Sequence, residues 1–195
     1  MRPVDHVLRV FTDADGRFGN FLGIFLDTGE WTDEQCQSRA HDLGFSETVF
    51  VDDIRTGRIR IFTPTVKLGF AGHPTVGAAW LIDHLGHEVH TLECEVGTVY
   101  SVATQLGATV LADPAWSPPI DLTQVASPEV VDSYRPWEGS HECVWAWIDE
   151  ARGIVRARAF VDEVGIEEDE ATGSAAILLA AHLNRALRIH QGVGS

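Results

Sequence analysis

Two segments of the sequence predict helices that are apolar around most of their circumference, and this constrains the fold more than any other feature. The first runs over residues 74–85 and the second over residues 172–187. A helix without a polar face must be enclosed by the rest of the protein. Since predicted strands outnumber helices along this chain, we expect a curved sheet around each helix, in an α+β fold that is not doubly wound.

The predicted strands are short and are distributed along the whole chain. They fall at residues 7–11, 21–26, 47–51, 58–63, 88–102, 108–111, 144–148 and 153–160. A further helix is expected to begin after Thr32, which forms a capping box with Gln35, and to end at Gly44. Residues 113–139 are rich in Pro, Ser and Asp. They predict a boundary between a domain of residues 1–112 and one of residues 113–195.

The two halves of the chain share a pattern that predicts an internal duplication. The motif Arg-x-Arg-x-Phe occurs at residues 58–62 and again at residues 156–160. Each copy precedes one of the apolar helices, and the starts of these helices also match. The matching pairs are Thr75 with Thr172, Ala78 with Ala175, Ala79 with Ala176 and Leu81 with Leu178. The shared order predicts two pseudo-repeated domains.

The composition excludes several classes of function. The formal net charge is −15, which argues against nucleic acid and anionic membrane surfaces as partners, because both are bound through clusters of Lys and Arg. No apolar run approaches the length of a membrane-spanning helix. The three cysteines form no CxxC motif, so we expect no structural metal and a reducing, cytoplasmic location. No glycine-rich nucleotide-binding motif follows a strand, and we expect no cofactor.

Five segments together resemble the PhzF-like family of phenazine-biosynthesis proteins. They are Gly19-Asn20, Ser46-Glu47-Thr48-Val49-Phe50-Val51, Phe62-Thr63-Pro64, residues 69–77 and residues 165–175. The resemblance implies the diaminopimelate-epimerase-like fold. In that fold each of two similar domains curls a sheet around a central helix, and the active site lies in the cleft between the domains.

The resemblance also implies the roles of individual residues. Glu47 matches the acid/base residue, and His73 and Asp169 match residues that assist it. The residues placed to bind substrate are Gly72, Thr75, Thr172, Gly173 and Ser174. Taken without the family, each has an ordinary alternative: a strand glutamate, a loop histidine, or a residue that caps a helix. Related epimerases that use two thiols carry them where this chain has Ala71 and Ala171, which argues against a two-cysteine racemase.

Two departures from the family pattern lead to further expectations. Glu170 stands where the family usually has Pro, and the sequence stops at Ser195 where relatives continue through further strands. The second sheet is therefore expected to be incomplete, and its open edge predicts a homodimer. We expect a cofactor-independent isomerase or epimerase that shifts a proton on a small carboxylic acid. The alternative is a shortened paralogue that binds a small acid or a protein partner without catalysis.

Overall fold

The computed structural model describes residues 2–161 and 166–192, and the chain divides into two compact units. Unit 1 contains Met1–Val10 and Phe21–Trp116, and unit 2 contains Phe11–Asn20 and Ser117–Ser195. This division differs from the predicted domains of residues 1–112 and 113–195, because a segment near the N-terminus packs with unit 2. Gly165 of the family motif and the terminal Ser195 lie outside the described residues.

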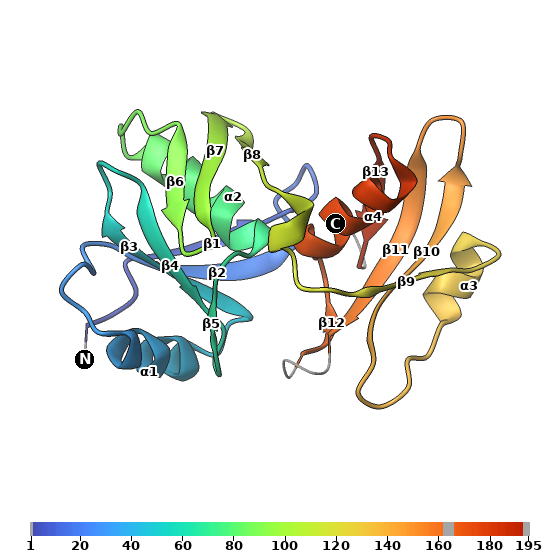
Figure 1. Ribbon diagram of the computed structural model, residues 1–195, viewed down its shortest axis with the longest axis horizontal. Coiled ribbons are helices and arrows are strands. Elements are labelled where there is room, and N and C mark those ends of the chain that lie inside the picture. Colours follow the sequence, from blue (N-terminus) through green and yellow to red (C-terminus); the bar gives the residue numbers. More distant parts are fainter. Residues whose placement is uncertain (1, 162–165, 193–195) are drawn as a thin grey trace. The chain divides into compact units, whose positions relative to one another are not determined.

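Unit 1 is built on a mixed eight-stranded sheet (Figure 1). Its strands are β1 (His6–Val10), β2 (Asn20–Phe25), β3 (Glu47–Asp53), β4 (Arg58–Phe62), β5 (Lys67–Leu68), β6 (Thr91–Cys94), β7 (Gly97–Thr104) and β8 (Gly107–Leu111). The order across the sheet is β1-β2-β3-β4-β6-β7-β8, and β5 pairs with β4.

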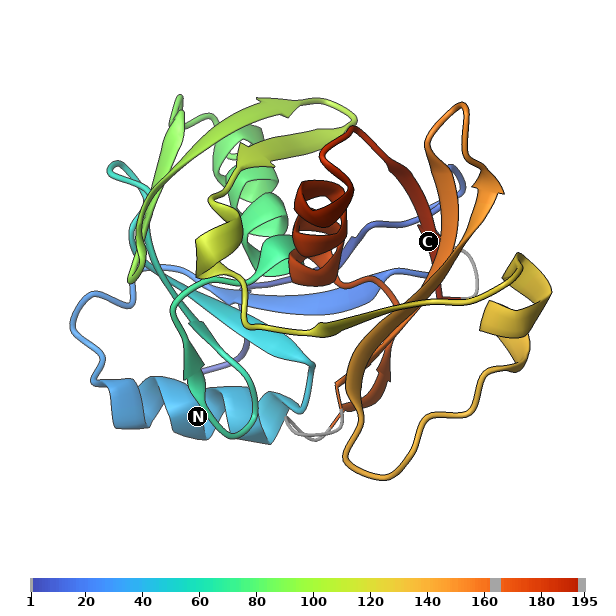
Figure 2. The same cartoon turned by 45° about the vertical axis from the view of Figure 1, so that its right-hand side comes forward.

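Two helices cover the opposite faces of this sheet. Helix α2 (Gly72–His84) contacts β1, β3, β6, β7 and β8, so the sheet curls around it (Figure 2). Close approach requires a glycine, because a Cβ atom on Gly77 would collide with the side chains of Leu22 and Val10. Helix α1 (Asp33–Leu43) lies on the other face, with the predicted capping box of Thr32 and Gln35.

Unit 2 has a five-stranded sheet, again with one helix on each face. Its strands are β9 (Asp121–Gln124), β10 (His141–Asp149), β11 (Ile154–Val161), β12 (Ile166–Asp169) and β13 (Arg188–Gln191). Helix α4 (Gly173–Leu183) packs through Ala175 and Leu179 against residues of β10 and β11. Helix α3 (Pro128–Ser133) packs through Val131 against the opposite face.

The strand pairing shows that unit 2 repeats most of unit 1. The series β2-α1-β3-β4-β5-α2-β6 recurs as β9-α3-β10-β11-β12-α4-β13. In both units the first and second strands of the series pair in parallel, and the second and third pair antiparallel. The third strand (β4 or β11) also pairs antiparallel with the short strand after it and in parallel with the strand after the central helix. The duplication that the sequence suggested therefore extends to the topology.

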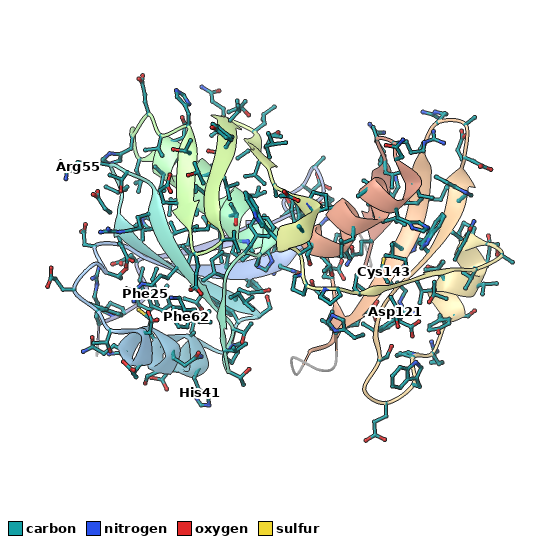
Figure 3. All side chains as sticks on the ribbon, viewed as in Figure 1. Phe25, His41, Arg55, Phe62, Asp121 and Cys143 are labelled. Carbon is teal, nitrogen blue, oxygen red and sulfur yellow. The ribbon has the colours of Figure 1, made fainter. Side chains whose placement is uncertain are left out.

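The recurring Arg-x-Arg-x-Phe motif has the same structural task in both units. Its alternate residues face the outer helix, where Phe62 packs with Phe25 beside α1 (Figure 3) and Phe160 packs with Val131 of α3. The guanidinium of Arg60 donates to the backbone oxygens of Thr28 and Trp31 just before α1. Arg158 likewise donates to backbone oxygens within and after α3. The motif thus fastens an outer helix onto each sheet.

Two predicted elements were wrong in detail, and the predicted boundary region contains secondary structure. The single strand over residues 88–102 is two strands, because Gly97 turns the chain at a φ of 133°. The helix over residues 172–187 ends at Leu183, where Asn184 adopts the left-handed conformation, and β13 follows. Residues 113–139 contain β9, α3 and a short 3-10 helix (Pro114–Trp116) besides loops. None of the described helices is long and apolar enough to cross a membrane.

Candidate active site

Glu47 and His73 meet in the interior of unit 1. Glu47 is the first residue of β3, and His73 is the second residue of α2. The His73 Nε2 atom lies 3.5 Å from Oε2 of Glu47, with side-chain exposures of 4% and 14%. Within the described part of the chain, Nε2 makes no hydrogen bond, so the carboxylate is the charged group that it faces. A buried carboxyl beside an imidazole is an arrangement that can hold and transfer a proton.

The start of α2 provides backbone N–H groups next to this pair. Its N-cap is Ala71, which has no side chain that could accept from them. Gly72 is the first helical residue and is buried. Thr75 is also buried, and its hydroxyl donates to the Ala71 backbone oxygen at 2.7 Å. That bond directs the Thr75 hydroxyl back into its own helix, while the predicted role of Thr75 in binding stays a prediction.

Asp169 is the centre of a hydrogen-bond network in unit 2. One carboxylate oxygen accepts from the Asn20 side-chain amide at 2.5 Å, and the other accepts from the Thr172 hydroxyl at 2.7 Å. Asn20 also donates to the backbone oxygen of Ala171 at 3.2 Å. These bonds fasten the loop that leads into α4. They also join Asn20 to the rest of unit 2.

Helix α4 begins at Gly173 with no side-chain cap, since the Thr172 hydroxyl donates to Asp169 and does not cap the helix. The amide of Gln191 donates to the Thr172 hydroxyl at 2.8 Å and to the Asp169 backbone oxygen at 3.0 Å. Gly173 and Ser174 are half-buried. The first N–H groups of α4 therefore carry the positive end of a helix dipole without a carboxylate or hydroxyl cap.

Glu170, which replaces the usual family Pro, packs against the backbone of Gly192. A Cβ atom at position 192 would collide with the carboxyl group and the backbone oxygen of Glu170. Gly192 also has a φ of 59°, in the left-handed region that favours glycine. Glu170 therefore packs against Gly192 at the end of β13. The absence of a side chain at Gly192 leaves the space that the Glu170 carboxyl group occupies.

The three cysteines lie on α1, β6 and β10, and none of them begins a central helix. Burial raises the pKa of the Cys36 thiol to about 11 and the pKa values of the Cys94 and Cys143 thiols to about 12. Thiols with such pKa values stay protonated at neutral pH and do not serve as bases. At the helix starts themselves the structure has the buried Ala71 and Ala171. A two-thiol mechanism has no support in this geometry.

The predicted site residues fall into two groups, one in each unit. Glu47, Gly72, His73 and Thr75 gather in unit 1, and Asp169, Thr172, Gly173 and Ser174 gather in unit 2. No motif in the sequence points to Gln191, and Asn20 belongs to a predicted feature only through the family pattern. The sequence signal for Asn20 is its place directly after Gly19, a turn residue that has a φ of 67° in the structure.

Solved structures show the class of fold. A PhzF-family phenazine biosynthesis protein from Bacillus anthracis is 20% identical, with a TM-score of 0.75 over 98% of this chain and 87% of that chain. A predicted epimerase from Pseudomonas aeruginosa is 24% identical, with a TM-score of 0.67 over 95% and 86%. The predicted α+β, epimerase-like fold with a sheet curled around a central helix is confirmed.

The sequence comparisons show the family. Residues 8–141 match the family described as phenazine biosynthesis-like protein, and the chain belongs to it. A trans-2,3-dihydro-3-hydroxyanthranilate isomerase from Pseudomonas aeruginosa is 31% identical, over 89% of this chain and 77% of the relative. The protein of the same name from Pseudomonas fluorescens is 29% identical over the same shares. The chain therefore belongs to a family that includes isomerases.

Proposed function

We propose that this chain is an isomerase or epimerase that shifts a proton on a small carboxylic acid, with Glu47 as the acid/base. The observation that carries the proposal is the buried pair of Glu47 and His73, 3.5 Å apart. The relatives named as isomerases support the same class of reaction. In this proposal unit 1 supplies the acid/base pair, and the start of α4 in unit 2 supplies N–H groups for an anion.

Glu47 has the principal chemical role in this proposal. Its carboxylate takes a proton from one carbon of the substrate, and the resulting carboxylic acid returns the proton to another carbon or to the opposite face. The reaction moves only a proton, so it requires no oxidant or reductant. The His73 imidazole lies against the carboxyl group and stabilises the carboxylate form when Nε2 carries a proton.

The helix starts are proposed to bind the substrate's own carboxylate. Gly72 and Thr75 belong to the first turn of α2, and Gly173 and Ser174 belong to that of α4. Uncapped N–H groups at the positive end of a helix favour an anion. Asp169 acts as the second acid/base group or orients one. Its bonds to Asn20 and Thr172 hold it at the start of α4.

Incorporation of solvent deuterium tests the role of Glu47. Candidate carboxylic acids are incubated with the protein in deuterium oxide, and exchange is followed by NMR for the wild type and for Glu47→Gln. The matched control is Glu34→Gln, because Glu34 is an exposed glutamate on α1. We expect exchange by the wild type and the control and none by Glu47→Gln. Equal exchange by all three proteins would remove Glu47 from the mechanism.

A non-catalytic binding protein is the second candidate. One observation supports it: helix α4 begins without a side-chain cap, and its first N–H groups favour an anion whether or not a proton is transferred. A small acid that binds with saturation, observed by NMR chemical-shift changes, but undergoes no exchange would support this reading. Binding that is lost in Gly173→Val would place the acid at the start of α4.

A further inference from the structure

Arg158 of β11 forms a bidentate ion pair with Glu168 of β12. The Nε atom of Arg158 lies 2.7 Å from one carboxylate oxygen of Glu168, and its Nη2 atom lies 2.7 Å from the other. Glu168 comes directly before Asp169 on this strand. Two parallel hydrogen bonds between a guanidinium and a carboxylate fix the orientation of both groups as well as their separation. The ion pair therefore holds β12 one residue before Asp169.

The guanidinium of Arg158 is itself held in place. Its Cζ atom lies 4.8 Å from the centre of the Phe160 ring, and its side chain is 13% exposed. Its Nη1 atom also donates to three backbone oxygens within and after α3, those of Val131, Asp132 and Tyr134. An ion pair near the surface contributes little unless its geometry is bidentate and its members are ordered. The pair of Arg158 and Glu168 meets this condition.

The duplication shows that this partner is specific to unit 2. Arg158 corresponds to Arg60 in the Arg-x-Arg-x-Phe motif, and Arg60 makes its bidentate contact with Asp52 of β3. The residues that oppose the two arginines across each sheet align β3 with β10, and two positions further along Asp52 corresponds to Ala146. An alanine offers no carboxylate. The arginine of unit 2 thus lacks the partner that β3 provides in unit 1.

A second difference between the two units supplies the replacement. The pairing of β5 with β4 and of β12 with β11 aligns Leu68 with Asp169. The residues before them, Lys67 and Glu168, therefore correspond to each other and have opposite charges. A lysine at this place repels the neighbouring arginine, whereas a glutamate attracts it. Together the two differences move the bidentate contact of the arginine onto the strand that carries Asp169.

The two faces of β12 serve different contacts. Successive residues of a strand point to opposite faces, so Glu168 lies on the α3 side with Arg158 and Asp169 lies on the side of α4. There the Asp169 carboxylate accepts from Asn20 and from Thr172, the N-cap residue of α4. Strand β12 has only four residues, and its register with β11 is irregular. The side-chain pair on its outer face therefore adds to a weak backbone ladder.

We propose that the ion pair of Arg158 and Glu168 positions Asp169 for proton transfer, which makes both of them positioning residues. This inference rests on the proposed function, in which Asp169 is the second acid/base group or orients one. Arg158 and Glu168 act through Asp169 from the other face of the sheet. Without the pair, β12 shifts, the bonds from Asn20 and Thr172 to Asp169 lengthen, and the carboxylate leaves its place in the site.

Glu168→Gln tests the inference, because it removes the charge and one acceptor oxygen but keeps the size of the side chain. The matched control is Asp132→Asn, since Asp132 of α3 pairs with Arg156 of the same motif at the same distance of 2.7 Å. The first measurement is the proton NMR signal of the Asn20 side-chain amide, which reports its bond to Asp169 independently of any activity. A longer bond shifts this signal upfield, and we expect that shift in Glu168→Gln and not in Asp132→Asn.

A second variant separates charge from geometry. Glu168→Asp keeps the carboxylate but is one methylene shorter, so it cannot hold the bidentate contact without moving β12. We expect the Asn20 signal to shift in the same direction as in Glu168→Gln, by a smaller amount. Circular dichroism and urea denaturation show whether each variant is folded under the conditions of the NMR measurement.

Deuterium exchange into candidate acids is the second measurement. We expect kcat to fall about tenfold in Glu168→Gln with KM changed less than about twofold, because the misplaced group acts in the proton step. An unchanged Asn20 signal, or a kcat equal to that of Asp132→Asn, overturns the inference. If the wild type exchanges no acid, the proposed function fails, whereas an upfield Asn20 signal still supports the positioning of Asp169 by the pair.

Discussion

The Nε2 atom of His73 lies 3.5 Å from the Oε2 atom of Glu47, and both side chains are largely buried in unit 1. The two residues are brought together by secondary-structure boundaries, since one begins β3 and the other is the second residue of α2. Helix α2 packs against β3, so the contact is fixed by the core of the unit. The fold thus holds the carboxyl group and the imidazole in contact, as the proposed acid/base role requires.

Replacing His73 tests whether the imidazole supports Glu47. His73→Gln keeps a polar side chain of similar length but cannot accept and release a proton. We expect the rate of deuterium exchange to fall by about a hundredfold. His84→Gln is the control, because His84 is exposed at the other end of α2 and stacks on Trp80. A rate unchanged from the wild type in His73→Gln would show that Glu47 acts without it.

Asn20→Asp tests the network at the start of α4. The substitution places a second carboxylate beside Asp169, where Asn20 now donates at 2.5 Å. Two neighbouring carboxylates repel each other and the amide donor is lost, so the urea midpoint at pH 7 should fall. Gln105→Glu, at an exposed amide in a turn, is expected to be nearly neutral. Equal urea midpoints for the two variants would contradict this account.

The sequence predicts local features of this fold well and long-range ones poorly. The capping box of Thr32 and Gln35 depends on neighbouring residues, and it is present as predicted. The end of α4 was missed because Arg185, Ala186 and Leu187 favour helix, whereas the pairing of β13 with β11 directs the chain into a strand. Short strands such as β9 depend on partners elsewhere in the chain and give a weak local pattern.

The candidate site shows the same contrast. Glu47 and His73 belong to motifs that are readable in the sequence, and the structure brings them together in unit 1. The bond from Asn20 to Asp169 joins residues 149 positions apart, and neither residue carries a local sign of the other. The role of Gln191 could not be predicted either, because its bonds to Asp169 and Thr172 depend on β13 lying beside the start of α4.

Arg60 is expected to contribute strongly to the stability of unit 1. Its guanidinium pairs with Asp52 and Asp33, each at 2.7 Å, and its side chain is only 14% exposed. Arg60→Ala leaves the buried Asp52 without its charged partner, which should cost about 3 kcal/mol in the free energy of unfolding. Arg55→Ala, at an 82% exposed side chain (Figure 3), should change it by less than about 0.5 kcal/mol. Urea denaturation measures both, and similar values for the two variants would refute the anchoring role of Arg60.

The cysteines give a prediction for alkaline pH. Burial raises the pKa of Cys36 to about 11 and those of Cys94 and Cys143 to about 12. An unfolded thiol ionises near pH 8.5, so the folded state binds more protons above that value and its stability falls as pH rises. The contribution of the thiols is complete below about pH 8.5 and is lost progressively through about pH 11 to 12. Replacing all three cysteines with Ala should flatten this part of the curve of unfolding free energy against pH.

The same protonated thiols should react slowly with a disulfide reagent at pH 8. We expect the folded protein to release little chromophore from Ellman's reagent and the urea-unfolded protein to release the amount due to all three cysteines. The cysteine-free variant should also keep its deuterium exchange, because both helix starts carry alanine in place of a thiol. Loss of exchange in a variant that remains folded would assign a cysteine to the reaction and would contradict this prediction.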